Sequence, residues 1–212
     1  MAVRLNNLLP EYQDRVRLRI RAFPLELHGD AAPRDILEQE WWLAAIQEPA
    51  AAFGPLPADW PTTTLPAFEA VWCANQQGEA VGHEYDLRVR RAFFAEGRNI
   101  GNHIVLLEIA QEAGLDLPEF KHLRDSGRAR DAVLAEAREG RERYRVRGTP
   151  TVMLADGERL HVPLAFPTMR ERKIVSIRPL PCYGEGCREA TRALFEEALQ
   201  REPSTETSLG VS

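Results

Sequence analysis

The chain has 212 residues, of which 44% are hydrophobic and 28% charged, a composition typical of a globular domain. Its formal net charge of −5 argues against a surface that binds nucleic acid through charge alone. No apolar run reaches the roughly 18 residues that a membrane span needs, so no membrane association is expected. Three cysteines, an odd number, fit a reducing cytoplasm better than a secreted disulfide scaffold, which predicts a cytoplasmic protein.

The first predicted elements are a helix and a strand. Apolar residues at helical spacing between Val3 and Tyr12 predict an amphipathic helix. Val16, Leu18 and Ile20 then alternate with arginines, which indicates a strand with one covered face. A solvated strand face explains these arginines more simply than a nucleic-acid site does.

A long, mostly helical region follows the strand. Glycines near 78, 97–101 and 114 and a loop rich in Pro and Ala at 49–66 divide it into pieces. The helices are predicted at 34–48, within 65–124, and at about 128–144.

The last third of the chain predicts a hairpin and a final helix. Asp156-Gly157 between the short apolar runs 151–154 and 159–162 is a strong hairpin signal. Residues 173–177 suit one more short extended piece, and the last helix is expected at about 188–200. The polar residues 203–212 predict a disordered tail.

The turn Gly148-Thr149-Pro150 enters the first strand of the predicted hairpin. X-Pro is the peptide bond at which the cis form costs little, so Thr149–Pro150 is a candidate cis bond. Such a turn leaves the Thr149 backbone unpaired and free to hold an extended peptide or a thiol-bearing ligand. A proline that simply begins an edge strand is the alternative interpretation.

Four segments carry a resemblance to a known family. They are Arg21-Ala22-Phe23-Pro24-Leu25, the stretch from Arg91 to Ile100, Gly114-Leu115-Asp116, and the stretch from Tyr144 to Thr151. With them, the chain resembles DsbA-family thiol–disulfide oxidoreductases of the FrnE-like group, which are relatives of the 2-hydroxychromene-2-carboxylate isomerases. The resemblance covers roughly residues 2–200.

The resemblance implies a thioredoxin-like α/β fold with an inserted helical subdomain. The expected core comprises 1–30 and 128–202, the insertion 31–127, and the tail 203–212. In that family Gly148, Thr149 and Pro150 would form the loop that binds the substrate, with the Thr149 backbone pairing with an extended substrate.

The family's first strand and its Cys-x-x-Cys motif have no counterpart in this sequence. In this topology that strand lies between the strand at 16–23 and the strand after Pro150. Without it, two rows of backbone groups would stay open, at about 1–3 kcal/mol for each buried unpaired group. We therefore expect the first strand to be missing from the fold and Met1 to be an internal codon of a longer protein.

Two of the remaining cysteines lie close together. Cys182 and Cys187 form a C-x4-C pair, and two intervening glycines could bring the sulfur atoms within bonding range. Cys187 would lie near a helix N-terminus, which favours its thiolate. The pair is either an auxiliary redox pair or two cysteines that stay reduced. Zinc binding would need two further ligands, so no metal is expected. Cys73 is predicted to be a small buried hydrophobic residue.

The leading functional hypothesis is thiol–disulfide exchange with a protein or small-molecule thiol or disulfide substrate, glutathione being one candidate, and without a cofactor. Cys182 and Cys187 are then the only candidate catalytic residues. We expect this chain to reduce insulin slowly and a version extended upstream to reduce it faster. The alternatives are a glutathione-dependent isomerase or transferase on the same fold, or a peptide-binding module without redox activity.

Overall fold

A computed structural model of the chain resolves two compact units, each described here by itself. The described residues are 1–12, 15–27, 33–162, 167–177, 182, 184–201 and 207–211. Unit 1 comprises Met1–Arg21, Ala32–Ala51 and Val146–Ser212, and unit 2 comprises Ala22–Ala31 and Ala52–Arg145. Within the described residues, no helix combines the length and apolar content that crossing a bilayer requires.

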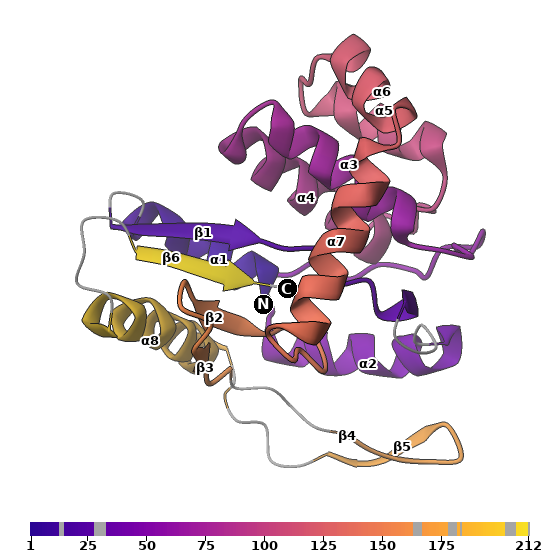
Figure 1. Cartoon of the computed structure of the whole chain (residues 1–212). Coiled ribbons are helices and arrows are strands. Elements are labelled where there is room, and N and C mark those ends of the chain that lie inside the picture. The colour runs from indigo at the N-terminus through magenta and orange to yellow at the C-terminus, as the bar shows by residue number, and fades with distance from the viewer. Residues whose placement is uncertain are drawn as a thin grey trace. The chain divides into compact units, whose positions relative to one another are not determined.

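Unit 2 is built of helices. Besides the short 3-10 helix η2 (Leu25–Leu27), they are α3 (Leu65–Gln76), α4 (Glu79–Phe94), α5 (His103–Glu112), α6 (Leu117–Asp125) and α7 (Arg128–Glu142). The helix breaks predicted at the glycines are confirmed, because Gly78 and Gly114 have positive φ angles between helices. In Figure 1, α3 and α6 pack against α7, while α4 packs against α3 and α5.

Tyr85 anchors the interior of unit 2. Its side chain is fully buried, its hydroxyl donates to the Leu106 carbonyl over 2.9 Å, and its ring lies 5.7 Å from that of Phe120. Burial raises the pKa of the Tyr85 hydroxyl, so it stays a neutral donor at any physiological pH.

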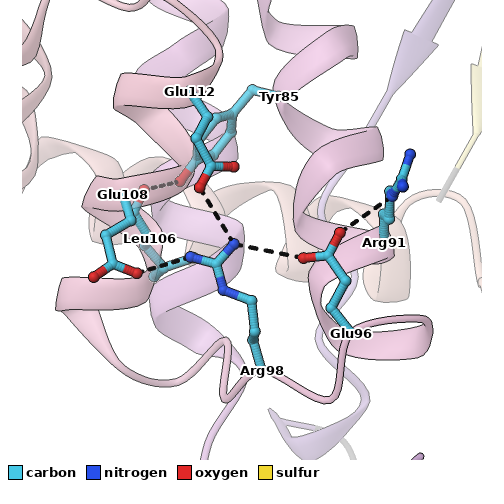
Figure 2. Close-up of polar contacts among 7 residues, drawn as sticks. All are labelled: Tyr85, Arg91, Glu96, Arg98, Leu106, Glu108 and Glu112. Atoms are coloured by element: carbon cyan, nitrogen blue, oxygen red, sulfur yellow. Dashed lines mark hydrogen bonds and ion pairs between the residues drawn. The ribbon is translucent and has the colours of Figure 1, made fainter. Parts of the chain in front are cut away.

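Arg98 connects the loop after α4 to α5 (Figure 2). Its guanidinium donates to Glu108 over 2.8 Å and lies 3.6 Å from carboxylate oxygens of Glu96 and Glu112. Glu96 also accepts a hydrogen bond from Arg91 over 3.1 Å. Without the cation, the carboxylates of Glu96, Glu108 and Glu112 would repel one another at this corner.

Gly54 shows why the loop before α3 needs a glycine. Its amide donates to the Phe94 carbonyl over 2.8 Å, and a Cβ atom at this position would lie 2.0 Å from the Ala95 carbonyl oxygen. Only glycine permits so close an approach of two backbones.

Unit 1 combines a four-stranded sheet, a hairpin and helices. The helices are α1 (Ala2–Leu8), the 3-10 helix η1 (Leu9–Glu11), α2 (Arg34–Gln47) and α8 (Glu185–Arg201). Buried Arg4 of α1 donates to Glu48 over 2.7 Å and to the Gln47 carbonyl over 2.9 Å, which fixes α1 to the end of α2.

The hydrophobic core of unit 1 lies between its sheet and two helices, α1 and α8. Alternate residues of the strands point into it, as the period-two pattern at Val16 and Leu18 predicted. The buried members of this core are Leu5, Leu8, Tyr12, Val16, Leu18, Val152, Leu154, Leu160, Leu194, Phe195 and Ala198.

The sheet has the strand order β1-β6-β2-β3. The strands are β1 (Val16–Ile20), β2 (Val152–Leu154), β3 (Arg159–Leu160) and β6 (Thr207–Val211). The hairpin predicted around Asp156-Gly157 is confirmed as β2 and β3. Strand β6 runs parallel to β1 and antiparallel to β2, and Figure 1 shows it between them.

Strand β6 corrects two expectations. Residues 207–211 are a strand and not part of a disordered tail, while residues 203–206 and 212 lie outside the described residues. The sheet is also not open between β1 and β2, because β6 takes the position expected to be empty. The physical reason lies in the backbone groups of β1 and β2, which would be unpaired without a strand between them. An extended segment that pairs with both strands removes the cost of those unpaired groups, and residues 207–211 do so.

The predicted extended piece at 173–177 is also confirmed, as one half of a second, two-stranded sheet. It consists of β4 (Pro167–Arg170) and β5 (Lys173–Ile177). Gln39 of α2 donates to the Arg172 carbonyl over 3.0 Å and accepts from the Ile174 amide over 2.9 Å. Asp35 binds the Arg172 guanidinium, so one face of α2 holds the hairpin.

The unit boundaries differ from the expected core and insertion. Helix α2, expected in the insertion 31–127, belongs to unit 1, and α7, expected in the core, belongs to unit 2. For α2 the reason is visible in its contacts with Arg4 and with the β4–β5 hairpin, which periodicity within one helix cannot reveal.

Candidate functional site

The Gly148-Thr149-Pro150 loop lies immediately before β2. The Thr149–Pro150 peptide bond is cis, which confirms the prediction. Buried Val146 and Val152 fix the two ends of the loop, while Gly148 and Thr149 between them are exposed. The Thr151 hydroxyl donates to the Gly148 carbonyl over 2.7 Å and closes the turn.

The Thr149 backbone faces no partner within the part of the chain that the structure describes. No hydrogen bond joins its amide or carbonyl to another described residue. Backbone groups in an exposed loop at the start of a strand can pair with an extended peptide, which is the physical basis of strand addition. The loop thus has the geometry of a peptide-binding element.

Cys182 and Cys187 form a disulfide. Their Cα atoms are 4.8 Å apart and the sulfur atoms are bonded. The two cysteines differ in burial, because Cys187 is fully buried whereas Cys182 is only partly buried. Of the two described residues, Cys182 is the one with exposed surface.

Cys187 is the third residue of α8. Its amide donates to the Gly184 carbonyl over 3.0 Å, and its own carbonyl accepts from the Thr191 hydroxyl over 2.8 Å. The partial positive charge of a helix N-terminus stabilises a thiolate in the first turn. This position favours the thiolate of Cys187 electrostatically.

Glu11 of η1 fixes the first turns of α8. Its carboxylate accepts hydrogen bonds from Arg192 and, over 3.3 Å, from Arg188. The hydrogen bond from Arg192 is the main cause that lowers the pKa of Glu11 below its ordinary value. Glu11 is therefore ionised under neutral conditions and holds the helix that carries Cys187.

Tyr12 makes a second contact with α8. Its ring stacks on Phe195 at 4.7 Å between centroids, and its hydroxyl donates to Glu196 over 2.5 Å. Burial and the Glu196 carboxylate raise the pKa of Tyr12. These positioning residues were not predicted from the sequence, although Arg188, Arg192 and Glu196 are spaced four residues apart and so lie on one face of α8.

The structure brings Cys182 and Cys187 together and places Gly148, Thr149 and Pro150 in one loop. Both groups belong to unit 1. Within the described ranges, no hydrogen bond or disulfide connects the loop to the cysteine pair. The pair and the loop are thus two separate candidate elements.

Cys73 belongs to neither element. It is free and fully buried in α3, as predicted for a small hydrophobe. Burial raises the pKa of its thiol to about 12, so almost no thiolate forms at neutral pH. Cys73 is not a candidate nucleophile.

Comparison with known proteins places this geometry in a family. The DSBA-like thioredoxin domain matches residues 1–173. The uncharacterized protein YwbO of Bacillus subtilis strain 168 is 30% identical over 149 residues, which are 66% of this chain and 73% of that protein.

Two solved structures are similar to the chain. A candidate protein disulfide isomerase from Nitrosomonas europaea has a TM-score of 0.62 at 17% identity, covering 95% of this chain and 90% of that one. The cytosolic disulfide reductase DsbM from Pseudomonas aeruginosa has a TM-score of 0.45 at 22% identity, over 69% of each chain. The first likeness supports the thioredoxin-like fold with its helical unit. The chain belongs to the DSBA-like thioredoxin domain family, the family of DsbA-type thiol–disulfide oxidoreductases.

Proposed function

We propose that the chain exchanges disulfides with thiol substrates through the Cys182–Cys187 pair. The observation that supports this proposal best is the unequal burial of the two cysteines, with Cys182 partly exposed and Cys187 fully buried in the first turn of α8. Exchange needs one sulfur open to attack and one that leaves as a stabilised thiolate. This pair offers both.

In the first step, a substrate thiolate attacks the Cys182 sulfur. The bond between the Cys182 and Cys187 sulfurs breaks, a mixed disulfide with Cys182 forms, and Cys187 leaves as a thiolate at the helix N-terminus. In the second step, a second substrate thiolate attacks the substrate sulfur of the mixed disulfide, and Cys182 leaves as a thiolate. Two substrate thiols are oxidised to one disulfide, and the pair is reduced to two thiols.

The Gly148–Pro150 loop would bind the substrate. Its exposed Thr149 backbone suits an extended peptide, and the neighbouring exposed Arg147 would attract a carboxylate or thiolate. A protein thiol is the main substrate that we propose. Glutathione disulfide, the oxidised form of a small peptide, is the proposed small-molecule partner that returns the pair to the disulfide form, and it is itself reduced to two glutathione thiols. Such exchange suits a cytoplasmic protein, where glutathione is abundant.

Mixed-disulfide trapping with glutathione disulfide tests the proposal. The variants Cys187→Ala and Cys182→Ala each keep one thiol of the pair, and the double variant controls for Cys73. Intact mass spectrometry of the native proteins should show one added glutathione on Cys187→Ala and none on Cys182→Ala. Addition to both variants would contradict the asymmetry, and addition to neither would show that the pair is structural.

A peptide-binding role without redox chemistry is the second candidate, and the lack of a described contact between the loop and the cysteine pair favours it. Binding of an unstructured, cysteine-free peptide by the parent and by Cys182→Ser separates the two. Equal binding together with no trapped glutathione would support the binding module.

A further inference from the structure

All pairing between β1 and the β2–β3 hairpin passes through one short segment. Strand β6 pairs with β1 along its full length, from Val16 opposite Thr207 to Ile20 opposite Val211. On its other side it pairs with β2, where Leu154 lies opposite Leu209. Among the described strands, β1 and β2 share no ladder with each other, so the two halves of the sheet depend on residues 207–211.

The position that β6 fills is lined by buried strands. Val16 and Leu18 on one side and Val152 and Leu154 on the other are 4% exposed or less. When β6 is absent, the backbone groups of β1 and β2 that face it lose their partners, and each group that stays buried costs about 1–3 kcal/mol. The position therefore demands an extended strand, parallel to β1 and antiparallel to β2.

The segment that fills this position is a weak strand former. Ser208 and Gly210 interrupt its apolar residues, and glycine weakens the interior of a strand. The preceding helix, by contrast, is fixed, because Arg201 at the end of α8 pairs with Glu158 in the β2–β3 turn and with Glu197. Helix α8 is thus fixed by ion pairs, whereas the strand that follows it has a low intrinsic propensity to form a strand.

We propose that the gap between β1 and β2 is a strand-acceptor site, and that a second copy of this chain can fill it with its own residues 207–211. Exchange between two copies keeps every ladder bond that the single chain makes, so only the entropy of association opposes it. The two ladders specify direction and register on both sides, and residues 207–211 satisfy both. The product is a reciprocal strand-exchanged dimer whose population rises with concentration.

The link from α8 limits the geometry of this dimer. An extended chain spans at most about 3.3–3.6 Å per residue, so Thr207 can lie no more than roughly 20 Å from Arg201 of the same chain. Each α8 must therefore end close to the acceptor site of the other copy. A two-fold arrangement satisfies this condition for both copies at once.

Cysteine pairs across the β1–β6 ladder test the proposal. Arg17 and Ser208 are register partners, so cysteines at these two positions lie within the usual disulfide range. Two single variants, Arg17→Cys and Ser208→Cys, are mixed at high concentration and oxidised, and cross-linked dimers are separated on a non-reducing gel. A mixture of Arg17→Cys with Glu189→Cys, an exposed position on α8, measures random collision.

Strand exchange predicts several-fold more cross-linked heterodimer in the Arg17→Cys and Ser208→Cys mixture than in the control mixture, and a yield that grows with protein concentration. In the double variant Arg17→Cys/Ser208→Cys at low concentration, an internal cross-link reports that β6 pairs with β1 of the same chain. An internal cross-link in the double variant without heterodimer in the mixture would overturn the exchange. Absence of cross-links in both would overturn the acceptor site itself.

Discussion

Val211 lies opposite Val152 in the antiparallel ladder between β6 and β2. Because Val152 is only two residues after Pro150, the last residue of β6 lies near the Gly148–Pro150 loop. Its direction, parallel to β1, points the end of the strand toward the Gly148–Pro150 loop. In DsbA-type proteins, the strand at this position leads into the redox motif that faces this loop. Strand β6 thus takes the place and the direction of that strand.

A Cys-x-x-Cys segment placed directly after Val211 should therefore face the Gly148–Pro150 loop. We expect the extended chain to reduce insulin at least several-fold faster than the parent, because thiolates would lie beside the exposed Thr149 backbone. A Ser-x-x-Ser segment of the same length is the matched control. Equal rates for the two extended chains would show that the end of β6 does not lie at this loop.

Replacing Leu209 by proline should destabilise unit 1. Leu209 pairs with Leu18 on one side and Leu154 on the other, so its amide faces a neighbouring strand in either case. Proline removes that amide and leaves its acceptor carbonyl on the neighbouring strand unpaired. We expect Leu209→Pro to lower the free energy of unfolding by about 1–3 kcal/mol more than Leu209→Ala does. Urea denaturation of both variants measures the difference; equal midpoints would contradict the pairing of β6.

The side chain of Gln39 should stabilise the β4–β5 hairpin against local opening. A two-stranded hairpin is marginal by itself, and Gln39→Leu removes both hydrogen bonds between this side chain and the hairpin backbone. We expect faster amide hydrogen exchange at residues 167–177, with little change in global unfolding. Glu38→Gln, an exposed neighbour on the same helix, should leave exchange unchanged. Unchanged exchange in Gln39→Leu as well would show that α2 does not hold the hairpin.

Glu11 should make the anchoring of α8 depend on pH. Its pKa is lowered in the folded protein, so the carboxylate stabilises the fold above its unfolded pKa of about 4.3, and this contribution is lost as the pH falls through the folded value. The Tm of Glu11→Gln should be slightly below that of the parent at pH 7 and equal to it near pH 3. Glu189→Gln should show no such pH-dependent difference. A difference that persists at pH 3 would have another cause.

Much of the fold could be predicted because local patterns decided it. The alternation at Val16, Leu18 and Ile20, the Asp156-Gly157 turn and the glycines that separate helices each act within a few residues. The family assignment rested on four segments, among them the Gly148–Pro150 turn between a helix and a hairpin and the upstream stretch from Arg91 to Ile100. The cysteine pair was found by its spacing alone.

Strand β6 could not be predicted in the same way. In residues 207–211 only Leu209 and Val211 alternate with Ser208 and Gly210, and this pattern, after a polar stretch, is too short to predict a strand. The open ladders of β1 and β2 are what make these residues a strand. The placement of α2 was missed for a related reason, since Asp35 and Gln39 bind a hairpin more than 130 residues away in sequence. Long-range pairing of this kind leaves no mark on local periodicity.

The most direct test of the account is the redox titration of the Cys182–Cys187 pair against glutathione. The protein is equilibrated at graded ratios of reduced to oxidised glutathione, quenched with an alkylating reagent, and counted for alkylated thiols by intact mass. The account predicts that Cys182 and Cys187 become alkylated together, as one two-electron couple, within the range that glutathione can buffer. A disulfide that stays closed at every ratio would contradict it and would make the pair a structural bond.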